Sequence, residues 1–254
     1  MSALIESSRD GHMLHLVLNR PAKRNALNAA LCRDLADALE SADTDDEVHA
    51  ILLSAAGKSF CAGMDLAEAS TSAGAPDIDA LHERLFTAGA RLATPIVAAV
   101  HGAALAGGTG LVANCHVVVA APDASFGLTE VRLGLWPFLV FRACATAMGE
   151  RRTVELSLTG RIFSAGDGRD FGLVHEISTE PVARAAEIAR QIAGFNPVAI
   201  CKGLQAVQQS RGLSHDQTGQ IARAARNQVF ESTGFREGVR SFLRTRSHNE
   251  SEQS

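Results

Sequence analysis

The chain has 254 residues, a formal net charge of −4, 46% hydrophobic residues and 20% charged residues. This composition excludes an extended disordered protein, and the length suits one large domain with or without a small extension. The slightly acidic balance argues against a nucleic-acid-binding protein that relies on positive charge. No apolar run reaches about 18 residues, and the N-terminus lacks an apolar signal core. We therefore expect neither a membrane span nor a secretory signal.

The five cysteines lie far apart and form no C-x-x-C pair. We expect them to be small buried hydrophobic residues in a reducing compartment, without a disulfide framework or a zinc site. The nine histidines form no H-x-x-x-H pair with a third ligand, so no metal site is predicted. These features together predict a cytoplasmic protein.

Strands and helices alternate in the first half of the chain, which predicts the α/β class. The second half reads as almost entirely helical, and no linker splits the chain into independent domains. A small, polar segment at 67–78 is expected to be a mobile loop. Strands are predicted at 12–18, 48–54, 96–100, 117–121 and 174–177. Helices are predicted from Asn28, as N-cap, to 42, and at 79–92, 181–194, 198–210, 216–231 and 234–246.

Two glycine patterns could indicate nucleotide binding, and neither is convincing. A P-loop at Gly57-Lys58 would need an earlier glycine where the chain has Leu52. Residues 108–113 fit G-x-G-x-x-A, but they do not follow a strand by a tight turn, and no acidic residue ends a second strand. Close helix packing explains this pattern better than a dinucleotide site, so a nucleotide-dependent dehydrogenase has little support.

Two other glycine loops, 61–66 and 105–108, each follow an apolar strand. Backbone N–H groups in such loops can converge on one oxygen as an oxyanion hole, where a single donor is worth about 10²–10³ in rate. Glu130 lies in an apolar stretch, and desolvation there would raise the pKa of its carboxyl toward useful acid–base values. Taken alone, Glu130 could equally be an ordinary loop carboxylate.

Considered together, these segments resemble the enoyl-CoA hydratase/isomerase, or crotonase, superfamily. The resemblance covers nearly the whole chain in the family's order and spacing. It is carried by residues 18–28 (LNRPAKRNALN), 60–66 (FCAGMDL), 102–108 (GAALAGG), 126–135 (FGLTEVRLGL), 158–165 (LTGRIFSA) and 172–174 (GLV).

The resemblance implies a spiral of ββα units at 1–195, followed by a C-terminal helical trimerisation region at 196–254 that belongs to the same functional unit. It implies a homotrimer or a hexamer built as a dimer of trimers. The substrate would be an acyl-CoA thioester of fatty acid metabolism. Coenzyme A would enter as part of that substrate, with no other cofactor.

The resemblance also assigns roles to individual residues. The N–H groups of Met64 and Gly107 would stabilise a thioester enolate, and Glu130 would be the acid–base residue. The expected CoA- and substrate-binding positions are Lys23, Arg24, Ala26, Ala62, Asp65, Leu66, Gly108, Trp136, Phe138 and Phe242.

Three departures from the family pattern bear on the reaction. Two-acid hydratases carry a second glutamate where this chain has Gly110, and other members carry an acid where it has Phe138. The usual Pro-Gly-x-Gly-Gly stretch is replaced by 137–141 (PFLVF), which with Trp136 should make the acyl pocket more apolar or fill it.

A single glutamate suffices to move a double bond from the 3- to the 2-position, whereas hydration is easier with two carboxylates. The sequence therefore favours an isomerase over a hydratase. Decarboxylation or dehydration of a branched acyl-CoA, and an acyl-CoA-binding protein with weak or no turnover, stay open. We expect Gly110→Glu to raise hydratase activity if the packing tolerates the side chain.

Overall fold

The structure, a computed structural model, describes residues 3–72 and 76–252. The chain divides into two compact units, Met1–Ala193 and Gly194–Ser254. The division falls beside the boundary expected from the sequence. The trimerisation role of the second unit stays a prediction.

The first unit contains a six-stranded sheet and a three-stranded sheet. The six-stranded sheet has the order β1 (Ile5–Asp10), β2 (Met13–Leu18), β3 (Ala50–Ala55), β4 (Ile96–Val100), β6 (Val117–Ala120) and β9 (Glu176–Ile177). β1 pairs antiparallel with β2, and the other neighbours pair parallel. The smaller sheet consists of β5 (Ala103–Leu105), β7 (Ser125–Gly127) and β8 (Phe163–Ser164).

The five predicted strands are confirmed, whereas β1, β5, β7 and β8 were missed. β1 is an edge strand whose residues after Ile5 are all exposed, so it lacks a hydrophobic signal. The other three have only two or three residues, too few to carry a period.

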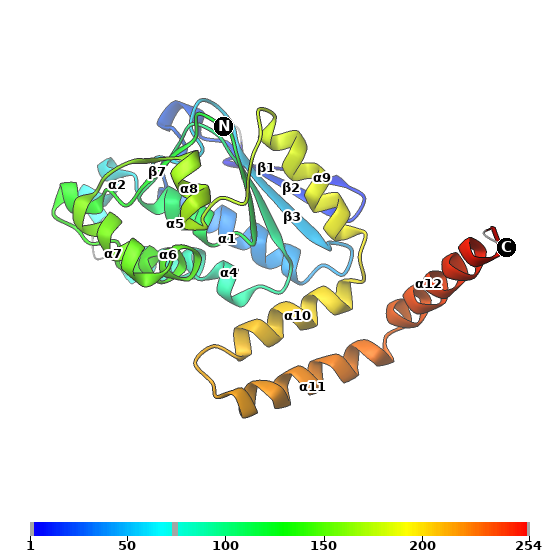
Figure 1. Cartoon of the computed structure of the whole chain (residues 1–254). Coiled ribbons are helices and arrows are strands. Elements are labelled where there is room, and N and C mark those ends of the chain that lie inside the picture. Colours follow the sequence, from blue (N-terminus) through cyan, green and yellow to red (C-terminus); the bar gives the residue numbers. More distant parts are fainter. Residues whose placement is uncertain (1–2, 73–75, 253–254) are drawn as a thin grey trace. The chain divides into compact units, whose positions relative to one another are not determined.

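Helices surround these sheets in the first unit (Figure 1). They are α1 (Ala29–Asp43), α2 (Leu66–Ser72), α3 (Pro76–Phe86), α4 (Ala88–Arg91), α5 (Gly107–Ala113), α6 (Phe138–Met148), α7 (Glu150–Thr159), α8 (Ala165–Phe171) and α9 (Pro181–Ala193), with 3₁₀ turns η1 (Pro21–Lys23) and η2 (Glu130–Leu133). The predicted cap of α1 is confirmed, since the Asn28 side chain accepts a hydrogen bond from Leu31 N at 3.1 Å.

The expectation of a mobile loop at 67–78 is wrong for its described residues, because α2 and the start of α3 occupy most of it. Residues 73–75 lie outside the described part of the chain. The physical reason is a helix cap: Asp65 Oδ1 accepts from the N–H groups of Ala67 and Glu68 at the start of α2. A proline at the first position of α3 favours its start.

Both faces of the six-stranded sheet are covered. On one face Leu16, Ile51 and Leu53 pack in the main core with α1. On the other face Met13 and Leu52 pack with the alanines of α9; Figure 1 shows α1 and α9 on opposite sides of the strands. Strands covered on both faces show no alternation of apolar and polar residues, which explains the apolar runs at 50–53 and 96–100.

The second unit consists of α10 (Pro197–Gln209), α11 (His215–Glu231) and α12 (Thr233–Glu252). The three predicted helices are confirmed, and α12 continues beyond its expected end at 246. Ser214 and Gln217 form a capping box that starts α11. Phe242 on α12 is exposed.

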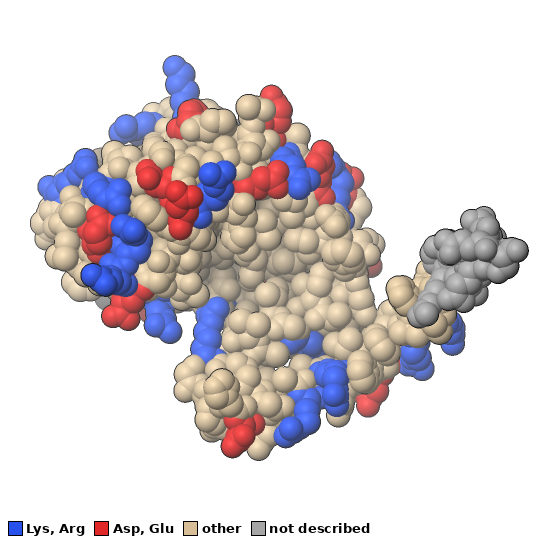
Figure 2. Space-filling view, viewed as in Figure 1, with Lys and Arg blue, Asp and Glu red and all other residues tan. Residues whose placement is uncertain are grey.

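Positively and negatively charged side chains are interspersed on the face shown in Figure 2, in line with the small net charge. Within residues 3–72 and 76–252, none of the helices combines the length and the apolar character needed to cross a bilayer.

Candidate active site

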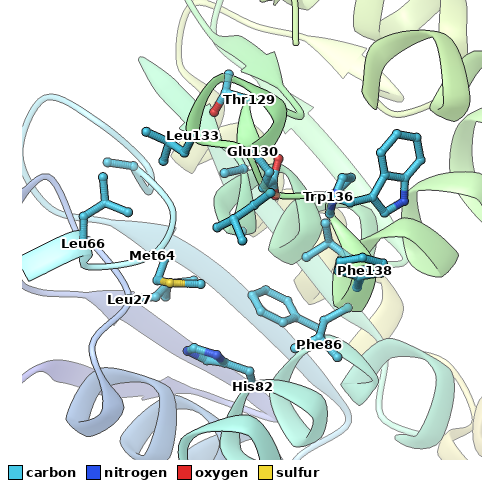
Figure 3. A pocket seen from close by; sticks show the side chains of 17 residues that line it. Leu27, Met64, Leu66, His82, Phe86, Thr129, Glu130, Leu133, Trp136 and Phe138 are labelled. Atoms are coloured by element: carbon cyan, nitrogen blue, oxygen red, sulfur yellow. The ribbon is translucent and has the colours of Figure 1, made fainter. Parts of the chain in front are cut away.

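The first unit contains a cavity of about 310 Å³ whose described walls are mostly apolar (Figure 3). Its lining comes from the loops before α1 and α2, from α3, from the start of α5, and from the segment that runs from the end of β7 into the first turn of α6. The lining residues are Leu27, Ala62, Met64, Leu66, His82, Phe86, Ala106, Gly107, Thr129, Glu130, Leu133, Leu135, Trp136, Pro137, Phe138, Leu139 and Val140.

The two glycine loops predicted from the sequence lie against each other at this cavity. Cys61 N donates to Ala103 O at 3.1 Å, and Leu105 N donates to Cys61 O at 2.9 Å. Gly63 has a φ of +89°, and a Cβ atom there would lie 2.8 Å from Leu105 O and 3.4 Å from Gly107 N. Only glycine allows this close approach, which brings the Met64 loop beside the start of α5.

The N–H groups of Met64 and Gly107 donate to no acceptor in the part of the chain that the structure describes. Gly107 is the first residue of α5, so its N–H has no partner within the helix. The preceding Ala106 has a φ of 50°, an unusual value for a residue with a side chain. Its N–H donates to Gly127 O at 2.7 Å, which helps to hold this conformation.

Thr109 joins the start of α5 to the strand that precedes Glu130. Its buried hydroxyl donates to Ala104 O at 2.7 Å and accepts from Gly127 N at 3.0 Å. Gly127 is the last residue of β7. The hydroxyl therefore ties the loop that carries Gly107 to the segment that carries Glu130.

Glu130 is the first residue of η2, and its side chain lines the cavity. Its Oε2 atom is buried and has no hydrogen-bond partner among the described residues. Burial raises the pKa of the Glu130 carboxyl above its ordinary value, as the sequence led us to expect. A carboxylate with a raised pKa is a stronger base than an ordinary glutamate, so it is suited to accepting a proton and returning it.

The space beside Gly110 is occupied. A Cβ atom at Gly110 would lie 2.2 Å from Cγ1 and 2.5 Å from Cβ of Val140. The packing therefore does not accommodate a glutamate at this position, so the condition under which Gly110→Glu was expected to raise hydratase activity is not met. The sequence left two outcomes open for the stretch that replaces the glycines: a more apolar pocket or a filled one. Residues 136–140 line the cavity rather than filling it.

Seven of the predicted site residues line the cavity: Glu130, Met64, Gly107, Ala62, Leu66, Trp136 and Phe138. Lys23, Arg24 and Ala26 do not line it, although their segment lies beside the first glycine loop, since Ala62 N donates to Arg24 O at 3.0 Å. The side chains of Lys23 and Arg24 are exposed. Contact of these residues with CoA stays a prediction.

Asp65 and Gly108 have structural partners instead of a place in the cavity wall. Asp65 caps α2 and forms an ion pair with Arg20 at 2.7 Å, which lowers the pKa of the Asp65 carboxyl. A Cβ atom at Gly108 would lie 2.2 Å from Cys61 O, so this glycine permits close packing of the loops. Phe242 belongs to the second unit, and its predicted role at a CoA pocket stays a prediction.

Sequence reasoning missed His82 and Phe86, whereas Val140 belongs to the 137–141 stretch that it placed at the acyl pocket. The available signal was their spacing, because His82 precedes Phe86 by one helical turn and the two side chains therefore share a helix face. Among the described residues, none of the clusters of His, Cys, Asp and Glu could hold a metal ion.

The chain is similar to known proteins along almost its full length. The family model described as enoyl-CoA hydratase/isomerase matches residues 9–252. The enoyl-CoA hydratase EchA19 of Mycobacterium tuberculosis is 32% identical over 97% of this chain and 95% of its own length. A peroxisomal Delta(3,5)-Delta(2,4)-dienoyl-CoA isomerase of Arabidopsis thaliana is 32% identical, covering 84% of each chain.

Solved structures give the same result for the fold. An enoyl-CoA hydratase of Mycobacterium smegmatis superimposes with a TM-score of 0.89 at 28% identity, covering 96% of this chain and 97% of its own. An enoyl-CoA hydratase of Bacillus anthracis gives a TM-score of 0.88 at 28% identity, covering 95% and 96%. The expected crotonase-like α/β fold with a C-terminal helical region is confirmed.

Proposed function

This chain belongs to the enoyl-CoA hydratase/isomerase family, and from that membership we propose that it isomerises the double bond of an enoyl-CoA, with Glu130 as its single acid–base group. Glu130 would take a proton from C2 of a 3-enoyl thioester. The electron pair moves onto the thioester oxygen as an enolate, and the same carboxyl returns the proton at C4. The product is the 2-enoyl thioester, and no water is added.

One observation carries this proposal. Glu130 is the only acidic residue among the described residues that line the cavity, and Val140 occupies the space where a second carboxylate would be needed at Gly110. A proton shuttle between C2 and C4 needs one base. Hydration must orient water and protonate a carbon, which one carboxylate performs less readily.

The backbone supports the enolate step. The N–H groups of Met64 and Gly107 have no acceptor within the described chain, and they belong to loops in close contact. Donors fixed in advance beside the thioester oxygen would stabilise the negative charge as it develops, without reorganisation. The mostly apolar wall would receive the acyl chain.

Hydration is the second candidate, because relatives of similar identity are named hydratases, including a 2,3-dehydroadipyl-CoA hydratase of Escherichia coli. Glu130 would then orient water and also supply the proton. An acyl-CoA-binding protein without turnover is a third possibility, and it predicts that Glu130→Gln changes nothing measurable.

The test is the ultraviolet absorbance of trans-3-octenoyl-CoA mixed with the pure protein, because conjugation of the double bond with the thioester raises absorbance. A lasting rise that Glu130→Gln abolishes supports isomerisation. No rise with the 3-enoyl ester, together with loss of absorbance from trans-2-octenoyl-CoA, would replace it by hydration. No change with either ester, while both bind, would contradict catalysis on these chains.

We propose further that the chain forms a homotrimer or a dimer of trimers and needs no cofactor beyond the CoA of its substrate. Light scattering coupled to size-exclusion chromatography measures the mass of the assembly. A monomeric mass at working concentration would contradict the first proposal.

A further inference from the structure

Arg20 is a partly buried cation between β2 and α1, and the proposed reaction gives it no task. Its side chain is 19% exposed and lies outside the described cavity wall. Its Nη1 atom donates to Asp65 Oδ2 at 2.7 Å and to Ala26 O at 2.9 Å. One guanidinium nitrogen therefore joins the segment before α1 to the loop before α2, which carries Met64.

The turn that brings Arg20 beside Ala26 is fixed by the wholly buried side chain of Asn25. Its Oδ1 atom accepts a hydrogen bond from Arg20 N at 2.7 Å. Its Nδ2 atom donates to Ala56 O and to Ser59 O, each at 2.9 Å. Both polar atoms of this amide are paired, so the turn is held firmly against the segment that follows β3.

The hydrogen bonds of Arg20 lead to the Met64 N–H through two peptide units. Ala26 O and Leu27 N belong to the first unit, and Leu27 N donates to Gly63 O at 2.8 Å. Gly63 O and Met64 N belong to the second unit. A trans peptide is planar, so its C=O and N–H point in opposite directions, and each hydrogen bond sets the direction of the next donor. The Met64 N–H, which donates to no acceptor among the described residues, is the free end of this chain.

The positive charge at the start of the chain strengthens the donor at its end. A hydrogen bond to a peptide oxygen draws electron density from that peptide, which makes the N–H of the same unit a better donor. Asp65 balances the charge of Arg20, but its Oδ1 atom also accepts from two N–H groups at the start of α2, so its negative charge is shared. A donor polarised in this way would stabilise negative charge that develops on an oxygen in front of it.

We propose that Arg20, acting through this chain of hydrogen bonds, orients and polarises the Met64 N–H toward the thioester oxygen of the substrate. Arg20 is thus a positioning residue, which acts on the substrate only through Met64. The inference rests on the proposed function, because it assumes that this N–H donates to an enolate. A clamp that only holds the fold together would affect stability and leave the thioester carbonyl unchanged.

The test is the infrared stretching band of the thioester carbonyl in hexanoyl-CoA, labelled with carbon-13 at C1 and bound to the protein. The saturated ester cannot undergo the proposed reaction, and hydrogen bonds that polarise its carbonyl lower the frequency of this band. In the wild type we expect the band of the bound ester below that of the free ester. An unshifted band, or no binding at all, would contradict the enolate step of the proposed function, and with it the inference.

Arg20→Met removes the charge and both hydrogen bonds. The band of its bound ester should return part of the way to the free value, and kcat for trans-3-octenoyl-CoA should fall by about tenfold. This loss is smaller than the roughly 10²–10³ that removal of a whole oxyanion donor costs. The affinity for hexanoyl-CoA should change less than kcat, and Arg20→Lys, which keeps the charge, should give an intermediate band. A wild-type band and kcat in a folded Arg20→Met protein would overturn the inference and leave the proposed function standing.

Two further variants separate the chain of hydrogen bonds from general stability. Arg20→Met/Asp65→Asn leaves no unpaired carboxylate, and asparagine can still cap α2, so this variant should show the same band as Arg20→Met. Arg184→Met breaks an ion pair of the same length, 2.7 Å to Glu176, on α9, which contributes no described residue to the cavity wall. It should keep the wild-type band and kcat. A band that moves as far in Arg184→Met as in Arg20→Met would also overturn the inference, because loss of any ion pair would then suffice.

Discussion

Gly110 on α5 and Val140 on α6 pack so closely that a Cβ atom on the glycine would lie 2.2 Å from Cγ1 of the valine. Each residue departs from the family pattern, one at a second-acid position and the other in a glycine-rich stretch. The contact makes the two departures sterically compatible, because a glutamate at 110 would not fit beside Val140. The pair leaves Glu130 as the single carboxylate among the described residues of the wall.

Gly110→Glu alone should therefore destabilise the protein without creating a hydratase. Overpacking of this kind typically costs about 1–3 kcal/mol. We expect a lower melting temperature and no gain in the rate of 2-enoyl-CoA hydration. A variant with unchanged melting temperature and increased hydration would contradict the packing argument.

The double variant Gly110→Glu/Val140→Gly should accept the second carboxylate, because the blocking side chain is removed. We expect hydration of a 2-enoyl-CoA to rise by at least about tenfold over the Val140→Gly single variant, less than the roughly 10²–10⁴ that an optimally placed acid–base group supplies. Gly110→Gln/Val140→Gly is the control, since it has the same shape without the carboxyl. Equal hydration rates in the two double variants would show that the added group performs no proton transfer.

Glu130→Gln should remove most turnover while CoA-ester binding persists. Loss of an acid–base group costs about 10²–10⁴ in rate, and the amide keeps the shape of the cavity wall. Steady-state kinetics with a 3-enoyl-CoA and calorimetry with hexanoyl-CoA measure the two effects separately. Comparable turnover in the variant would remove Glu130 from the mechanism.

The acid limb of the pH–rate profile should lie above the ordinary pKa of a glutamate, which is about 4.3. The base must be ionised to accept a proton, and burial raises the pKa of the Glu130 carboxyl. The ratio kcat/KM should therefore fall as the pH decreases through this raised pKa. The pH dependence of kcat/KM gives the pKa of the group in the free enzyme. An acid limb at the ordinary value would contradict the desolvation of Glu130.

Glu130→Gln should also raise the thermal stability of the protein near neutral pH. The folded chain holds the Glu130 proton more tightly than the unfolded chain does, so ionisation of this buried carboxyl reduces stability at every pH above the raised pKa. Glu130→Gln removes that penalty, and the gain should fade as the pH falls from the raised pKa to the ordinary pKa, below which the gain is absent. Melting temperatures of the wild type and of Glu130→Gln, measured from acid to neutral pH, show whether the variant is the more stable protein near neutral pH.

Thr109 should act as a positioning residue through its hydrogen bonds to Ala104 O and Gly127 N. Thr109→Val leaves two buried backbone groups without this partner, at a cost of about 1–3 kcal/mol. We expect kcat to fall more than the affinity for hexanoyl-CoA, because the loop of Gly107 and the segment of Glu130 lose their common anchor. Thr109→Ser, which keeps the hydroxyl, should restore kcat. Equal kcat values in Thr109→Val and Thr109→Ser would indicate that Thr109 has a purely structural role.

Local sequence rules predicted most of the large elements. The apolar runs at 48–54 and 96–100 and the Asn28 cap depend on neighbours along the chain, and all three appear where expected. The segment 67–78 did not follow its composition, because Asp65 caps α2 from outside the segment and also pairs with Arg20. Short strands such as β5 and β7 exist only because they pair with each other, so no local signal indicates them.

The sequence by itself determined the family resemblance, the two glycine loops and the acid–base candidate, because each depends on residue type and spacing along the chain. The tertiary structure alone decided which groups share the cavity. It placed His82 on its wall and closed the space at Gly110 with Val140. These relationships join residues about thirty positions apart or more through helix packing. The physical reason is that steric exclusion and desolvation act between neighbours in space, whatever their separation along the chain.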